Sequence, residues 1–266
     1  MAKKHLGQNF LFDPSILHRI IEVSGITPED TVVEIGPGPG RLTLLLAGAA
    51  RKVVAVELDK ELYEKLKGEI RGYRNIELIH ADALHYPYQE LEPFKVVANI
   101  PYYITTPLIF RLIEAREKLQ SMTLTIQKEV AERIVAGPGT KEYGVLSVML
   151  QYYSEARISF IIPRGAFRPT PEVDSAVIHF EIRKSPKVSV RDERLFFTTV
   201  KTAFAQRRKT LANALKSLAK ESREGLLLAG IDPTRRAETL SIEEFAVLAD
   251  TLRSLLPSRS SGRGKE

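Results

Sequence analysis

The first half of the sequence alternates between short β-branched segments and longer segments in which apolar residues recur with helical spacing. Strands that alternate with helices in this way form a parallel sheet with helices on both faces, so the predicted fold class is α/β. A helix start is predicted at Asp13-Pro14. The predicted strands are 31–35, 52–56, 75–80, the segment beginning at 95, 122–127, 158–162 and 176–182, and the predicted helices between them are 42–50, 58–71, 107–118 and 128–135.

Glycine or polar residues follow four of these strands at the point where each strand ends. They are the glycine-rich turn 36–40, Glu57, Asp82 and Asn99. In an open parallel sheet, ligands bind outside the carboxyl ends of the strands. The sequence therefore predicts that these four features meet in one crevice.

The second half of the sequence divides into loops and helices. A glycine-rich loop is expected at 137–144 and a linker at 184–190, and the pattern is helical from Asp192 onward. We predict a catalytic domain at 1–184 with an N-terminal arm, a small all-α domain at 185–257, and a small, polar and charged tail at 258–266 that is disordered.

Composition excludes several classes of function. The net charge of +6 and the pI of about 9.4 favour an anionic partner such as nucleic acid, although a solvated basic face would give the same charge. The sequence contains no cysteine, which excludes a disulfide, a thiolate–metal site and a cysteine nucleophile. No segment reads as a signal peptide or a membrane span, so the expected location is the cytoplasm, with no membrane partner.

The segment Asn99-Ile100-Pro101-Tyr102 predicts a binding site for a planar amine. Ile100 precedes a proline, which favours extended backbone, and Pro101 has a fixed φ and no N–H. The Asn99 amide oxygen and the Ile100 carbonyl could accept both hydrogens of an NH₂ group, while the attached base stacks on Tyr102. The alternative is a buried strand followed by a turn in which Asn99 caps the next helix.

The glycine-rich turn and the acid that ends the second strand predict a nucleoside cofactor, with Glu57 accepting from ribose hydroxyls. NAD is one alternative, but its G-x-G-x-x-G spacing is absent, and Pro37 and Pro39 remove N–H groups that a pyrophosphate needs. S-adenosylmethionine has no phosphate, and Asp82 could accept from its adenine amine. The expected reaction is methyl transfer to nitrogen without a metal. Methylation at a pyrimidine C5 is excluded because its usual route needs a cysteine.

Seven motifs, in order, make the sequence from about residue 5 to 245 resemble the KsgA (RsmA) family of ribosomal RNA adenine dimethyltransferases: GQNFL, VVEIGPGPGRLT, VELD, ADAL, NIPYYIT, FRPTPEVDS and FAQRRKTLANAL. The resemblance implies a Rossmann-like class I methyltransferase sheet with an all-α C-terminal domain, and S-adenosyl-L-methionine as cofactor. It also implies N6,N6-dimethylation of two adjacent adenosines in a hairpin loop near the 3′ end of small-subunit (16S) rRNA, linked to small-subunit biogenesis.

The resemblance also implies roles for individual residues. The chemistry is assigned to Asn99, Ile100, Pro101, Tyr102 and Phe167, with Tyr102 and Phe167 on either side of the target base; the alternative for Phe167 is a place in the core. Some members of the family carry a polar residue at the position of Tyr103, and substitution at this position is expected to be tolerated. The residues implied in cofactor binding are Asn9, Leu11, Gly36, Gly38, Glu57, Leu58, Asp82, Ala83 and Asn99.

Contacts with the small ribosomal subunit are expected from the N-terminal arm and the second domain. The predicted RNA-binding residues are Lys3 and Lys4 in the arm, and Arg207, Arg208 and Lys209 within a helical pattern. A monomer is expected. Two other functions remain open. One is methylation of large-subunit rRNA, the reaction of the related group of enzymes that confer macrolide resistance. The second-domain segment FAQRRKTLANAL favours the small-subunit group. The other is a non-catalytic RNA-binding assembly factor, which the intact cofactor residues disfavour.

Overall fold

The computed structural model describes residues 9–206 and 208–255, which form two compact units. The first contains residues up to Val135 and Tyr153–Ser185, and the second contains Ala136–Tyr152 and the chain from Pro186 onward. The second boundary lies next to the predicted break at 184. The prediction of one continuous first domain was wrong, however, because residues 136–152 belong to the second unit.

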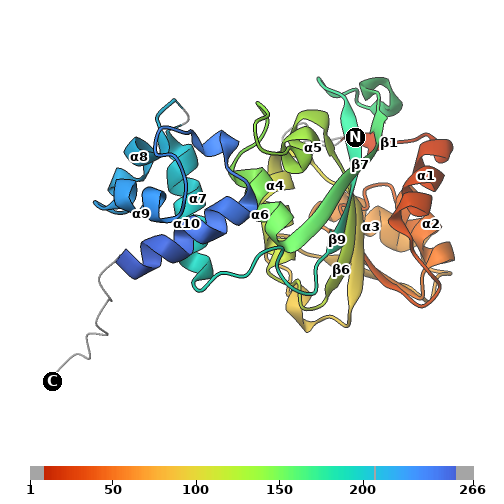
Figure 1. Ribbon diagram of the computed structural model, residues 1–266. Coiled ribbons are helices and arrows are strands. Elements are labelled where there is room, and N and C mark those ends of the chain that lie inside the picture. The colour runs from red at the N-terminus through yellow and green to blue at the C-terminus, as the bar shows by residue number, and fades with distance from the viewer. Residues whose placement is uncertain (1–8, 207, 256–266) are drawn as a thin grey trace. The chain divides into compact units, whose positions relative to one another are not determined.

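A seven-stranded sheet forms the centre of the first unit (Figure 1). The strand order is β4-β3-β2-β5-β6-β9-β7. The strands from β4 to β6 run parallel, whereas β9 is antiparallel to both of its neighbours. The strands are β2 (Thr31–Ile35), β3 (Lys52–Glu57), β4 (Ile76–His80), β5 (Phe94–Asn99), β6 (Leu119–Gln127), β7 (Ser154–Ile162) and β9 (Ser175–Ile182).

Helices cover both faces of this sheet. The side chains of the central strand β2 alternate between the two faces, and all five of its residues are buried. The predicted α/β fold class is therefore confirmed. The helices are α1 (Pro14–Ser24), α2 (Arg41–Ala49), α3 (Lys60–Glu69), α4 (Thr105–Ile113) and α5 (Lys128–Val135). The predicted start of α1 is also confirmed, because the Asp13 side chain accepts from the Ser15 N–H at 2.9 Å.

Helix α4 is shorter than the sequence pattern predicts. It ends at Ile113, and the next residues form tight turns in which the N–H groups of Ala115, Arg116 and Lys118 each donate to the carbonyl three residues earlier. Such bonds tighten and end a helix. Similar short turns are η2 (Tyr88–Glu90), η3 (Tyr102–Ile104), η4 (Arg164–Ala166), η5 (Leu215–Ser217) and η6 (Ala237–Thr239).

The second unit is helical and includes α6, a helix that the sequence pattern did not predict. Tyr152 in α6 stacks on Phe196 at a centroid distance of 5.0 Å, and Tyr143 packs edge-on against Phe204 at 5.8 Å. These buried aromatic contacts hold 136–152 in this unit. The helices are α6 (Val145–Tyr153), α7 (Glu193–Ala205), α8 (Leu211–Ala214), α9 (Ser222–Leu228) and α10 (Ile242–Leu255). The predicted tail at 258–266 lies outside the described residues.

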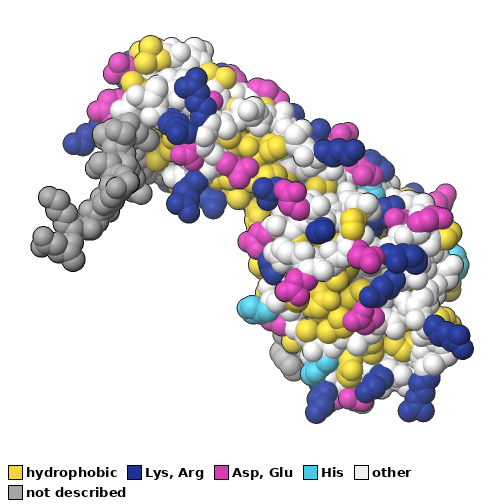
Figure 2. Space-filling view, turned by 90° about the horizontal axis from the view of Figure 1, so that it is seen from below, with side chains coloured by type: hydrophobic (Ala, Val, Ile, Leu, Met, Phe, Trp, Pro, Cys, Tyr) yellow, Lys and Arg dark blue, Asp and Glu magenta, His cyan; other side chains and the backbone are white. Residues whose placement is uncertain are grey.

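The described surface carries charges of both signs. On the face seen in Figure 2, Lys and Arg side chains alternate with Asp and Glu side chains and do not merge into one basic field. Within the described ranges, no helix has the length and apolar character that crossing a membrane requires.

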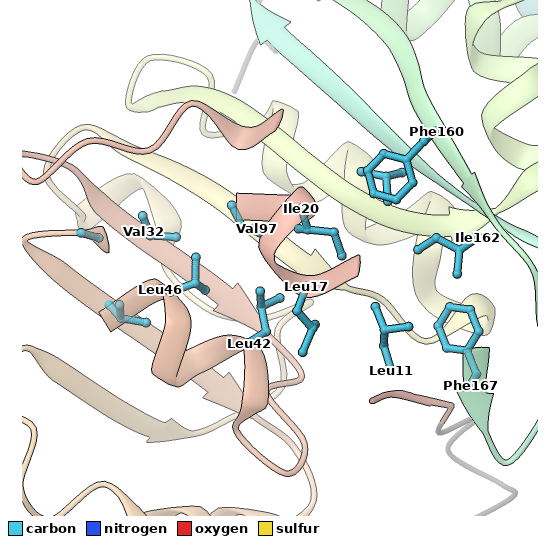
Figure 3. Close-up of a cluster of buried hydrophobic side chains, with 13 residues drawn as sticks. Leu11, Leu17, Ile20, Val32, Leu42, Leu46, Val97, Phe160, Ile162 and Phe167 are labelled. Atoms are coloured by element: carbon cyan, nitrogen blue, oxygen red, sulfur yellow. The ribbon is translucent and has the colours of Figure 1, made fainter. Parts of the chain in front are cut away.

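A buried hydrophobic cluster packs against one face of the sheet (Figure 3). Helices α1 and α2 supply Leu17, Ile20, Leu42 and Leu46, which pack with the strand residues Val32 and Val97. The short strand β1 (Phe10–Leu11) pairs with β8 (Phe167–Arg168), and this places Leu11 directly opposite Phe167 at the edge of the cluster. The N-terminal segment is therefore fixed close to the strand ends that carry the predicted site.

Candidate active site

One pocket lies at the carboxyl ends of β4, β3, β2 and β5. The structure brings together eleven of the residues that the sequence predicted for chemistry or cofactor binding. They are Asn9, Gly36, Gly38, Glu57, Leu58, Asp82, Ala83, Asn99, Ile100, Pro101 and Tyr102. The predicted convergence of the four strand ends on one crevice is confirmed. Among the described residues, no group of three or more His, Cys, Asp or Glu side chains could hold a metal ion.

The glycine-rich loop offers no N–H group to a phosphate. Its two prolines have none, and its three glycine N–H groups all donate within the protein. Gly36 donates to the Val56 carbonyl at 2.9 Å, Gly38 to a carboxylate oxygen of Glu57 at 3.1 Å, and Gly40 to the Pro37 carbonyl at 2.9 Å. A pyrophosphate would need such donors. The loop therefore suits a cofactor without a phosphate.

Phe10 covers this loop and lines the pocket, although the sequence pattern did not single it out. Gly38 has a φ of +56°, and a Cβ built on it would lie 2.7 Å from the Phe10 ring, so only glycine fits beneath the ring. Adjacent residues of a strand point to opposite sides, and Leu11 points into the core. The pairing of β1 with β8, which the sequence does not show, therefore leaves Phe10 on the side of the pocket.

Glu57 is a buried acceptor at the base of the pocket, with 5% of its surface exposed. Its carboxylate accepts from the N–H groups of Gly38 and Asp59, at 3.1 and 2.8 Å. Burial raises the pKa of Glu57, and these two donors oppose the shift. Asp82 lies at the end of the neighbouring strand, where one carboxylate oxygen accepts from the Leu84 N–H at 2.8 Å. The pocket thus presents two acidic groups from adjacent strand ends.

A hydrogen bond fixes the orientation of the Asn99 amide. Its Nδ2 donates to the main-chain carbonyl of Asn9 at 2.9 Å. Because a carbonyl can only accept, the NH₂ edge must face Asn9, and the Oδ1 atom points away from it as an acceptor. Asn99 does not cap α4, since the cap position is Ile104 and no side chain bonds there. The capping alternative for Asn99 was wrong.

Tyr102 and Tyr103 follow in the short helix η3, and both line the pocket. The Tyr102 hydroxyl lies 2.7 Å from the Ser175 Oγ, which ties this ring to β9. Burial raises the pKa of Tyr102, so the phenol stays protonated at neutral pH. Tyr102 is therefore a fixed, flat surface beside Asn99.

The structure contradicts the predicted pocket positions of Phe167 and Leu11. Phe167 is fully buried, Leu11 is 5% exposed, and both belong to the hydrophobic cluster. Figure 3 shows the two side chains next to each other and close to Ile162. The pairing of β1 with β8 turns both side chains toward the core. Phe167 is therefore a core residue of this structure, as the alternative predicts, and it does not line the pocket.

The basic run is only partly described, because Lys3, Lys4 and Arg207 lie outside the described residues. Arg208 and Lys209 are exposed. They lie in a turn between α7 and α8, where the Lys209 N–H donates to the Gln206 carbonyl at 2.9 Å. The prediction that the run continues a helix was wrong, since α7 ends at Ala205. A turn can present both side chains on one side more readily than a helix can.

Glu34 is a buried acid behind the glycine-rich loop, with 2% of its surface exposed. Burial raises the pKa of Glu34 to about 8, and the negative charge of Glu57 adds to the shift. In the described part of the chain its Oε2 atom has no hydrogen-bond partner. Folding therefore favours the protonated carboxyl, and ionisation of this group opposes folding.

We expect Glu34 to make stability fall with rising pH. A raised folded-state pKa means that its contribution is complete below the unfolded pKa of 4.5 and is lost as the pH rises to about 8. Within this window, ionisation of Glu34 should lower the free energy of unfolding by at most about 1.4 kcal/mol per pH unit. Urea unfolding of wild type and Glu34→Gln between pH 5 and 8 checks this. The stability of wild type relative to Glu34→Gln should fall as the pH rises, and parallel curves would contradict the assignment.

Comparison with known proteins agrees with this geometry. A family model described as ribosomal RNA adenine dimethylase matches residues 1–254. A ribosomal RNA small subunit methyltransferase A from Clostridium botulinum is 50% identical over 260 residues, which cover 95% of this chain and 94% of the relative. The protein of the same name from Listeria welshimeri is 47% identical over 275 residues, with coverages of 97% and 93%.

Two solved structures share the fold over most of the chain. The 23S rRNA methyltransferase ErmE has a TM-score of 0.74 and 29% identity, with coverage of 92% of this chain and 100% of its own. A dimethyladenosine transferase from Plasmodium falciparum has a TM-score of 0.77 and 27% identity, with coverages of 90% and 95%. Because the family model spans nearly the whole chain, and relatives that align over more than nine tenths of both chains are about half identical to it, this protein belongs to the ribosomal RNA adenine dimethylase family.

Proposed function

We propose that this protein transfers methyl groups from S-adenosyl-L-methionine to the N6 atoms of two adjacent adenosines near the 3′ end of small-subunit rRNA, two on each. The observation that carries the proposal is the oriented Asn99 amide, whose Nδ2 donates to the Asn9 carbonyl, in a pocket that Asn99 and Ile100 both line. The enzyme acts as a monomer on the small ribosomal subunit in the cytoplasm. The family and the names of the relatives support the reaction and the rRNA substrate.

The residues of the pocket fit S-adenosylmethionine. The loop at 36–40 has no N–H for a phosphate, and this cofactor carries none. Glu57 is placed to accept from ribose hydroxyls and Asp82 to accept from the adenine amine, with Leu58 beside them. When bound, the cofactor supplies a sulfonium whose methyl group is electrophilic. The fold is that of Rossmann-like class I methyltransferases, in which such a pocket lies at the strand ends.

Asn99 and Ile100 prepare the adenine amine to act as a nucleophile. Its lone pair is delocalised into the ring, and two carbonyl-type acceptors that hold both hydrogens favour a more tetrahedral nitrogen. Tyr102 holds the base by stacking, with its own ring fixed by Ser175. The nitrogen gains a methyl group and loses one proton in each transfer. After the first transfer it still carries one hydrogen, so one acceptor suffices to orient it for the second.

Methylation of large-subunit rRNA is the alternative that the comparisons do not favour. The 23S rRNA methyltransferase ErmE is 29% identical to this chain, whereas the small-subunit relatives are 47–50% identical over a similar span. The test is to incubate the enzyme with labelled S-adenosylmethionine and either small or large subunits that lack the modification. Label in the small subunits alone is expected. Label confined to the large subunits would contradict the proposed substrate.

We expect Arg208 and Lys209 to bind RNA phosphates. Phosphate contacts position proteins on RNA and release counterions. Replacing both residues with alanine should weaken binding to small subunits and lower the slope of log affinity against log salt by about 0.7 for each phosphate that is no longer neutralised. Filter binding at several salt concentrations measures this slope. Alanine at Arg71 and Lys118, two exposed cations of the first unit, is the matched control. An unchanged slope in the Arg208/Lys209 variant would show that these residues are only a solvated basic face.

A further inference from the structure

Tyr103 is one of the large side chains of the described structure that remain exposed, at 54% of its surface. Leu58 is another, at 47%, and both line the same pocket. Large apolar surfaces that stay exposed at the rim of a pocket commonly mark a ligand-binding surface. Leu58 follows β3 and Tyr103 lies just beyond β5, so the two side chains flank the pocket on either side of β2.

The two tyrosines of η3 face different groups. Tyr102 is tied to Ser175, and Asp174 is the acid that acts on it electrostatically. The acids that act on Tyr103 are Asp82 and Glu57, the two carboxylates assigned to the cofactor's nucleoside. Burial, and then these two negative charges, raise the pKa of the Tyr103 phenol. Tyr103 therefore lies on the cofactor side of the pocket, and Tyr102 on the side of Asn99 and β9.

Strand spacing gives the distance across the pocket. Neighbouring strands are about 4.8 Å apart, so the ends of β3 and β5, with β2 between them, are about 10 Å apart. Leu58 offers an apolar surface on one side, and the Tyr103 ring offers an aromatic surface on the other.

We propose that Tyr103 covers the adenine of the bound cofactor opposite Leu58, so that its ring, and not its hydroxyl, sets the affinity for the cofactor. This inference rests on the proposed function, which supplies the cofactor. The family resemblance alone suggested that substitution here would be tolerated, and the position of the side chain leads to the opposite expectation.

Calorimetric titration of the full chain with S-adenosylhomocysteine tests the proposal. Tyr103→Ala should raise the Kd about 5- to 150-fold, which is the change expected when one ring loses its stacking partner. Tyr103→Phe keeps the ring and should bind like wild type. Tyr73→Ala removes another exposed tyrosine of the same unit, one that does not line the pocket, and should leave the Kd unchanged. Thermal unfolding of Tyr103→Ala should match wild type because the side chain is largely exposed.

Three outcomes would overturn the proposal. The first is a Tyr103→Ala variant that binds S-adenosylhomocysteine as tightly as wild type. The second is a Tyr103→Phe variant as weak as the alanine variant, which would assign the role to the hydroxyl. The third is an unchanged Kd with a raised KM for the small subunit, which would place Tyr103 against the target base. Wild-type protein that binds S-adenosylhomocysteine but methylates no small subunit would instead refute the proposed function and leave the role of Tyr103 intact.

Discussion

Replacing Asn99 with alanine is expected to lower turnover by roughly 10²–10³, the cost of removing one hydrogen-bonding group that acts in a transition state. In the proposed mechanism the Asn99 Oδ1 atom holds the amine while its nitrogen changes geometry, and the Nδ2 bond to the Asn9 carbonyl fixes that oxygen in place. Single-turnover methylation of small subunits measures the chemical step. The methylation rate of Asn99→Ala should stay low at saturating cofactor, because the Asn99 oxygen acts on the target amine.

Two comparisons make this test specific. Cofactor affinity of the Asn99→Ala variant, measured by calorimetry, should change much less than its turnover, since Glu57 and Asp82 remain in place. Asn213→Ala removes an exposed amide of the second unit, which donates to the Thr210 hydroxyl, and should leave turnover unchanged. Near wild-type methylation by Asn99→Ala would rule out the proposed hold on the amine.

Replacing Phe167 with alanine is expected to lower the free energy of unfolding by about 3–5 kcal/mol, the usual cost of removing a buried aromatic side chain from a core. Phe167 is fully buried and lies opposite Leu11 in the pairing of β1 with β8. Loss of the ring leaves a cavity where the N-terminal segment is fixed. Urea unfolding without cofactor measures the effect.

A second substitution at this position provides the control. Phe167→Leu keeps most of the apolar volume and should lose much less stability than the alanine variant. If Phe167→Ala were as stable as wild type but bound RNA poorly, the ring would be a base-stacking group after all, and the core assignment would fail.

Most of the site could be predicted because its residues lie at strand ends. The apolar segments 31–35 and 52–56 identify strands, and parallel topology then brings Gly36, Glu57, Asp82 and Asn99 to the same edge of the sheet. Pro37 and Pro39 leave the loop with few N–H donors for a phosphate, as the sequence alone predicts. The three glycine N–H groups of the loop, which the sequence could not assign, are also used within the protein.

The incorrect predictions concern contacts between distant parts of the chain. In a strand of two residues the sequence cannot show which side chain faces the core, and only the pairing with β8 turns Leu11 inward and leaves Phe10 over the pocket. Residues 136–152 were assigned to the first unit by their position in the sequence. Their true place depends on Tyr143 and Tyr152 packing on α7, and no local pattern encodes that packing.

We propose that this pocket methylates adenosine N6 in small-subunit rRNA. Mass spectrometry of small-subunit rRNA, after incubation of unmodified subunits with the enzyme and S-adenosylmethionine, tests this proposal. The rRNA is cut into oligonucleotides to locate the modification. We expect N6,N6-dimethyladenosine at two adjacent positions near the 3′ end with the wild-type enzyme, and at most traces with Asn99→Ala in the same time. Methyl groups on another atom or another nucleotide, or none at all with an enzyme that binds the cofactor, would contradict the claim.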